Sequence, residues 1–132
     1  MDMVPSSNRF ADAANGLFYI SETDAEILPF NGGEAKSVTA AEILRQTARA
    51  ADGPVEEIDP SAFFERLTTI KDWFGEPEKA RAARFAVLFT ELKSGLTDLH
   101  VFRIGQIRID IYIVGLDADG RLAGVQTMAV ET

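Results

Sequence analysis

The sequence predicts an α+β fold, an α/β/α sandwich in which a central antiparallel sheet carries helices on both faces. Apolar residues recur at helical spacing in several stretches between residues 7 and 95, whereas the last third of the chain alternates with a period of two. A short strand pattern at residues 26–30 lies between helical stretches, so the helices can cover opposite faces. The 132 residues contain no repeat and no long linker, which predicts one domain over residues 1–132.

The chain opens with a predicted helix over residues 7–15 that Gly16 ends. An apolar run at residues 17–20 then turns abruptly acidic. The short strand at residues 26–30 follows, and the turn residues Asn31-Gly32-Gly33 are expected to close it.

The next helix has a clear beginning, because Thr39 followed by Glu42 is the sequence of a capping box. Its helical spacing continues through Ala51, and Gly53-Pro54 is expected to end it. Residues 55–58 are then predicted to be extended.

Two further helices begin at prolines, which favour the first helical position. Asp59-Pro60 is expected to cap and start a short one, and Glu76-Pro77 opens the longest, which Gly95 closes. The apolar stripe of this longest helix consists of Phe85, Leu88, Phe89 and Leu92.

The last third of the chain predicts a meander of antiparallel strands. Residues 101–104 and 107–114 form a hairpin around Gly105-Gln106, and isoleucines occupy every second position of its second strand. A turn at residues 117–120 then leads to a strand over residues 121–130.

Composition limits the function. With 13 basic and 21 acidic residues the net charge is −8, which disfavours direct nucleic-acid binding and suits a basic protein partner. Most of the acidic excess lies in residues 1–60. No cysteine is present, and neither a signal peptide nor a membrane span is recognisable, so we expect a cytoplasmic protein without membrane contact.

Residues suited to catalysis do not converge. The single histidine, His100, lies where a strand begins and predicts a structural or surface role, and Asp110 is expected to pair with Arg108, Arg103 or another cation. Glu22, Asp24 and Glu26 alternate and can be imagined around a hard cation, but a solvated acidic loop is the stronger interpretation. We therefore predict no enzyme activity, no cofactor and no intrinsic metal site.

Three features suggest a binding surface. Trp73 is the only tryptophan and lies between two predicted helices, where it either packs on the core or serves as an interface anchor. Glu22 follows the apolar run on a short connector. The sequence ends with Val130-Glu131-Thr132 after a strand, which can present a hydroxyl and carboxylates together.

Taken together, these stretches resemble the nuclease A inhibitor family. The resemblance covers residues 15–132 and includes Ser21-Glu22, Asp72-Trp73-Phe74 and the final Val130-Glu131-Thr132. It is carried by residues 15–22, 61–66, 68–69, 72–74, 93–96, 101–105, 110–115, 120–124 and 130–132. Residues 23–38 and 45–57 are dissimilar, so part of an interface rim can differ there.

The resemblance implies helices on both sides of an antiparallel sheet and binding in the active site of a sugar-non-specific DNA/RNA nuclease of the ββα-metal class. It assigns partner contacts to Glu22 and Trp73, and it brings Thr132 towards the nuclease's own magnesium region. Their acidic neighbours Asp24 and Glu131 complete the predicted set. We expect a monomer that forms a one-to-one complex. The alternative is an interaction module of the same fold with a non-nuclease partner.

Overall fold

The computed structural model describes residues 6–48 and 53–132. Its helices are α1 (Ser6–Ala14), α2 (Ala40–Thr47), α3 (Pro60–Thr68) and α4 (Glu76–Gly95). Its strands are β1 (Phe18–Ile20), β2 (Asp24–Glu26), β3 (Leu28–Glu34), β4 (Val55–Ile58), β5 (Thr97–Gly105), β6 (Arg108–Leu116) and β7 (Arg121–Val130). Within these ranges no helix has the length and apolarity needed to cross a membrane.

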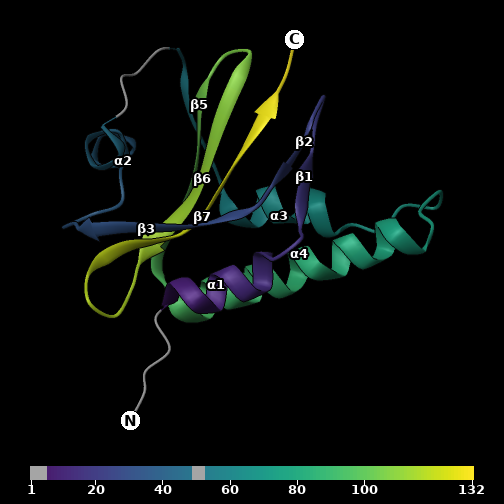
Figure 1. Ribbon diagram of the computed structural model, residues 1–132, viewed down its shortest axis with the longest axis horizontal. Helices are drawn as coiled ribbons and strands as arrows, with labels where there is room; N and C mark the ends of the chain where they lie inside the picture. The colour runs from purple at the N-terminus through teal and green to yellow at the C-terminus, as the bar shows by residue number, and fades with distance from the viewer. Residues whose placement is uncertain (1–5, 49–52) are drawn as a thin grey trace.

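Five strands form one antiparallel sheet in the order β3-β7-β6-β5-β4, and β1 and β2 form a separate hairpin. Helices α1, α3 and α4 lie on one side of the sheet, and α2 lies on the other (Figure 1). The predicted sandwich with helices on both faces is therefore confirmed. Strand β7 lies inside the sheet, and the chain ends two residues beyond it.

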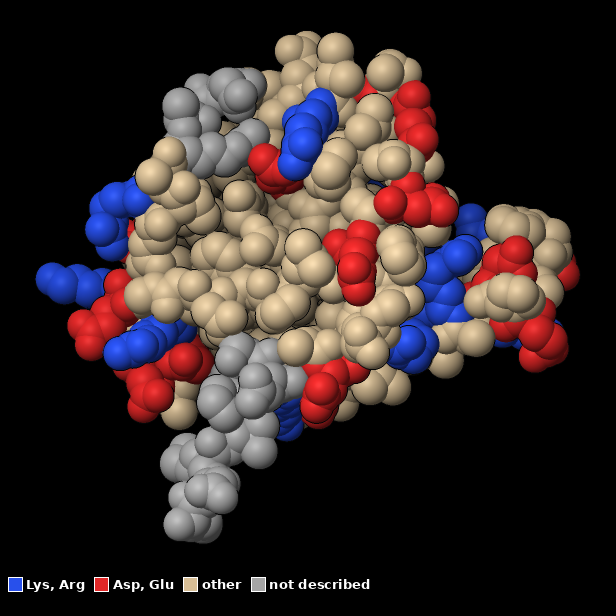
Figure 2. Space-filling model, in the orientation of Figure 1, with Lys and Arg blue, Asp and Glu red and all other residues tan. Residues whose placement is uncertain are grey.

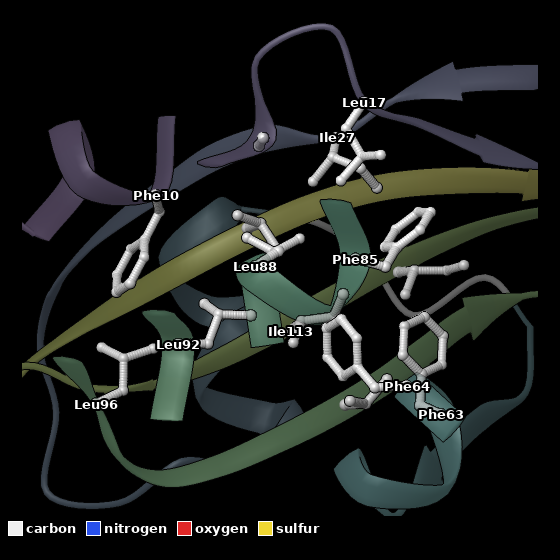
Figure 3. Close-up of a cluster of buried hydrophobic side chains, with 14 of the residues drawn as sticks. Phe10, Leu17, Ile27, Phe63, Phe64, Phe85, Leu88, Leu92, Leu96 and Ile113 are labelled. Atoms are coloured by element: carbon white, nitrogen blue, oxygen red, sulfur yellow. The ribbon is translucent and has the colours of Figure 1, made fainter. Parts of the chain in front are cut away.

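The main core fills the space between the sheet and the helices α1, α3 and α4 (Figure 3). Leu88 and Leu92 of α4 are fully buried there, as the predicted apolar stripe requires. A smaller cluster under α2 contains Ile43, Tyr112 and Val114. Alternate residues of β6 therefore enter different clusters, which explains why both faces of this strand are apolar.

Local signals at the helix ends are confirmed in most cases. The Thr39 hydroxyl accepts a hydrogen bond from the backbone N–H of Glu42 at 3.1 Å, and Asp59 Oδ2 accepts one from Ala62 N–H at 3.0 Å. Helices α3 and α4 carry proline in their first turn, and α4 ends at Gly95 as expected. The Thr39 and Asp59 side chains thus satisfy backbone donors that a helix leaves unpaired at its start.

The strand predicted at residues 26–30 is present as β3, but its bounds and its closing turn are wrong. Strand β2 ends at Glu26, and β3 continues through Asn31-Gly32-Gly33 to Glu34. The reason lies in α2, where the Gln46 side chain accepts a hydrogen bond from Gly33 N–H and donates to the carbonyl of Glu34. A Cβ at Gly32 would lie 2.5 Å from Gln46 Oε1, so glycine here permits close packing rather than a turn.

The helix predicted to continue through Ala51 also ends early. Helix α2 stops at Thr47 because Ala48 adopts a left-handed conformation with φ of 54°, and Ala51 lies outside the described residues. The reciprocal half of the expected capping box is replaced as well. The Glu42 carboxylate contacts the side chains of Arg45 and Gln46.

Strand β5 begins at Thr97, four residues earlier than the predicted start at residue 101. Asp98 has a φ of 55° at an irregularity between Thr97 and His100, which bends the start of the strand. The His100 Nδ1 lies 2.6 Å from Glu57 of the edge strand β4, and its Nε2 lies 2.9 Å from Asp98. The ring also stacks on Phe102. This arrangement agrees with the predicted structural role.

We predict that His100 makes stability depend on pH. Partial burial lowers the pKa of His100, but hydrogen bonds to Glu57 and Asp98 outweigh burial and raise that pKa above 6.5. The folded chain thus binds the proton more tightly than the unfolded chain does. The resulting stabilisation is fully present below about pH 6.5 and is lost as pH rises through the raised pKa.

Urea unfolding of the wild type and of His100→Gln at pH 5.5 and pH 9 measures this effect. The difference in unfolding free energy between the two proteins should be larger at pH 5.5. An equal difference at both pH values would contradict the prediction.

Candidate functional site

Hydrogen bonds join the end of β7 to the loop after β1. The backbone N–H of Glu22 donates to the carbonyl of Val130 at 3.3 Å, and the Val130 N–H donates to the Ser21 hydroxyl at 3.1 Å. On the other side, the Glu131 N–H donates to the carbonyl of Ile107 at 2.9 Å. The last residues are therefore held between the β1–β2 loop and the β5–β6 turn.

Glu22 and Thr132 meet directly at this place. The Thr132 N–H donates to Glu22 Oε2 at 2.6 Å, and the Thr132 hydroxyl donates to Glu22 Oε1 at 2.7 Å. These two hydrogen bonds lower the pKa of Glu22, so the carboxylate is ionised at neutral pH. Both residues are exposed. The tip thus presents a carboxylate and a hydroxyl side by side.

Glu131 is held by Arg103 of β5. The Arg103 Nη2 donates to Glu131 Oε2 at 2.6 Å, and its Nε lies 3.4 Å from a carboxylate oxygen of Glu56 in β4. Only 13% of the Arg103 side chain is exposed. Such charge-assisted hydrogen bonds from a packed guanidinium fix the orientation of the Glu131 carboxylate. We call Glu22, Glu131 and Thr132 the acidic tip.

Arg103 was missed as a site residue in the sequence. A charged residue in a strand between the buried residues Phe102 and Ile104 is the signal that could have found it. From the sequence, Arg103 is expected only as one possible partner of Asp110. In the structure Asp110 instead lies 3.5 Å from Arg108, which confirms the first of the predicted pairings.

Asp24 does not join the acidic tip. It pairs with Ile20 across the β1–β2 hairpin, and it lines a hollow that also contains Arg81 and Arg84 of α4. Arg84 is already engaged there, because it donates to the carbonyls of Ala13 and Asn15 at the end of α1. Figure 2 shows acidic side chains over the hairpin and basic side chains over α4.

The three alternating carboxylates of the loop point to different partners. Glu22 contacts Thr132, Asp24 lines the hollow beside α4, and Glu26 accepts a hydrogen bond from Gly16 N–H at 3.4 Å. Across residues 6–48 and 53–132, no cluster of three or more histidine, cysteine or acidic residues is suited to hold a metal ion.

Trp73 lies on the loop between α3 and α4, away from the end of the chain in Figure 1. Its side chain is 71% exposed, and its ring meets the edge of the Phe74 ring with centroids 4.8 Å apart. The tryptophan therefore does not pack on the core. An exposed tryptophan on a short loop is the kind of residue that anchors interfaces.

The structure thus joins three of the five predicted contact residues and separates two. Glu22, Glu131 and Thr132 form the acidic tip, whereas Asp24 and Trp73 lie on the hairpin and on the α3–α4 loop. Ile107 was also missed. It lies at the β5–β6 turn with a largely exposed side chain, and its carbonyl holds Glu131.

Comparison with known proteins identifies the family. Residues 5–132 match the profile of a family described as "Nuclease A inhibitor-like protein". No curated protein matched the chain. The family match spans nearly the whole sequence, including the β1–β2 loop, the α3–α4 loop and the end of β7. This chain therefore belongs to the nuclease A inhibitor-like family.

Proposed function

We propose that this chain inhibits a sugar-non-specific DNA/RNA endonuclease of the ββα-metal class by occupying its active-site cleft. The observation that carries the proposal is the exposed contact between Glu22 and Thr132. It presents a carboxylate and a hydroxyl together at one point of the surface. The neighbouring residue Glu131 adds a second carboxylate. The chain acts by binding in this proposal, and it performs no chemistry of its own.

The chemistry of a nuclease cleft supports this choice of partner. A site that holds a phosphodiester offers positive charge and a hard metal ion that prefers oxygen ligands. An ionised carboxylate has about four lone-pair positions, and Thr132 uses one on each oxygen of Glu22. Glu22 can therefore accept hydrogen bonds from cationic residues of the cleft while it keeps its contact with Thr132. The Thr132 oxygen can approach the metal ion of the nuclease.

Pre-organisation supports the proposal as well. Backbone bonds from Glu22, Val130 and Glu131 already order the tip in the free chain. A partner then has little conformational freedom left to remove, which favours affinity. The net charge of −8 also favours rapid encounter with a basic cleft.

Trp73 supplies a second proposed anchor on a separate loop. Its exposed ring offers a large apolar area that loses little side-chain freedom when it is covered. Contacts at the acidic tip and at the α3–α4 loop would together orient the inhibitor in one way. We propose a monomer that forms a one-to-one complex with the nuclease in the cytoplasm. In that complex Asp24 would lie at the edge of the interface.

We predict that Glu22→Gln and Thr132→Val each raise the inhibition constant by about 30-fold, the usual scale of an interface hot spot. The assay follows plasmid DNA cleavage by a purified ββα-metal nuclease with Mg²⁺ present. Because both substitutions weaken the same contact between Glu22 and Thr132, the double variant should lose less than the product of the single losses.

Glu34→Gln is the matched control, since Glu34 pairs with Arg121 at the opposite end of β7. This variant should inhibit as well as the wild type. Unchanged inhibition by all three tip variants would overturn the site assignment. A wild-type chain that fails to inhibit any such nuclease would favour the interaction module with another partner.

We also predict that Trp73→Ala raises the inhibition constant by about 10-fold or more while the midpoint of thermal unfolding changes little, because the side chain is mostly exposed. Val87→Ala, at an exposed apolar position of α4, is the control. Trp73 is the only tryptophan of this chain, so the fluorescence of the wild-type complex minus that of the Trp73→Ala complex reports on this residue. Its emission should shift to shorter wavelength on addition of nuclease, and an unshifted spectrum would exclude burial of Trp73 in the complex.

A further inference from the structure

A hollow of about 550 Å³ lies between the acidic tip and the α3–α4 loop. Its walls come from β1, α3 and the β4–β5 pair, and Arg103 lines it on the side of the tip. Thr69 and Lys71 also line it, and both belong to the α3–α4 loop that carries Trp73. The hollow therefore lies between the two places at which the proposed partner is anchored.

The floor of the hollow is apolar, and its rim carries two cations, Arg66 and Lys71, beside one carboxylate, Glu65. Tyr19 stacks parallel to Phe63 at 5.9 Å, and Ile58 and Leu67 complete the apolar lining. Arg66 and Lys71 are exposed at the rim, and neither forms an ion pair with another described residue. Arg103 differs from them because Glu56 and Glu131 neutralise it.

An excess of positive charge at this rim is unexpected. The chain is strongly acidic, and the proposed nuclease cleft is basic, so Arg66 and Lys71 would face charge of their own sign if the whole partner surface were basic. Like charges placed opposite each other in an interface reduce affinity. Two unpaired cations beside an apolar floor instead complement an acidic group that follows an apolar side chain.

We propose that this hollow receives a loop of the nuclease that carries a carboxylate next to an apolar side chain. The inference rests on the proposed function and adds to it. The apolar side chain enters against Tyr19 and Leu67, and the carboxylate pairs with Arg66 and Lys71 at the rim. Every nuclease must hold phosphate, so a basic cleft cannot distinguish one from another. A rim carboxylate can, and the hollow is thus the element that selects the cognate nuclease.

Charge reversal tests this with a result of defined sign. Arg66→Glu/Lys71→Glu is compared with Lys36→Glu/Arg121→Glu, which changes the net charge by the same amount. Arg121 begins β7, about 30 Å from its end at 3.3 Å per residue, and Lys36 lies beside it near Gly120. Inhibition constants are measured with an inhibited ββα-metal nuclease, and thermal unfolding checks that each variant folds.

The hollow variant should inhibit at least 10-fold less well than the equally charged control, and Arg66→Gln/Lys71→Gln should show a smaller loss in the same direction. A hollow variant that inhibits as well as the control, or better, would overturn the proposal. The wild type and Glu22→Gln in the same assay report separately on the proposed function, because they leave Arg66 and Lys71 unchanged.

A carbodiimide cross-linker gives a second readout that needs no variant. It joins a lysine amine directly to a carboxylate in contact with it. In the complex, mass spectrometry should find Lys71 joined to an aspartate or glutamate of the nuclease, whereas Lys36 and Lys93 should not be joined to it. Absence of the Lys71 product in an otherwise inhibited complex would contradict the proposed pairing.

Discussion

The placement of β7 inside the sheet is the constraint on which the acidic tip depends. A strand paired on both sides cannot shift its register without breaking two sets of hydrogen bonds. Its last residue, Val130, is therefore fixed relative to the β5–β6 turn and to the loop after β1. The tip residues gain defined positions because the backbone N–H groups of Glu22, Val130 and Glu131 donate hydrogen bonds that tie the end of the strand to its neighbours.

The hydrogen bonds between Glu22 and Thr132 act on position more than on stability. Both side chains are exposed, and water would satisfy them in the unfolded chain, so the contact adds little to folding. It does restrict the rotamers of a glutamate and a threonine that would otherwise move freely. For a binding surface that restriction is useful, since the conformational freedom is already lost before the partner arrives.

Sequence patterns predicted those parts of the fold that depend on local chemistry. The caps at Thr39 and Asp59 and the alternation of β6 involve residues only a few positions apart. The errors occur where a distant side chain decides the backbone. Gln46 holds the glycines of β3 in a strand, although the same glycines in isolation favour a turn. No local rule could show this contact between two elements.

The same distinction applies to the site. Glu22 and Thr132 are 110 residues apart, and only the resemblance to a family, not spacing, suggested that they act together. The sequence places Asp24 in the site as an acidic neighbour of Glu22, but the tight β1–β2 hairpin pairs it with Ile20 and places it beside α4. The role of Arg103 cannot be predicted from local sequence, because its partners, Glu56 and Glu131, become its neighbours only when the sheet has formed.

Cations on this surface serve different purposes according to their burial. Arg103 is packed and paired, so its charge is neutralised within the chain and orients Glu131. The surface of the acidic tip therefore stays acidic towards solvent. Arg66 and Lys71 are exposed and unpaired within the described chain, so their charge remains available to a partner. An acidic point beside a basic hollow is a pattern of charge that a uniform surface cannot match. Affinity for a phosphate-binding cleft and choice among such clefts can therefore reside in neighbouring but separate groups.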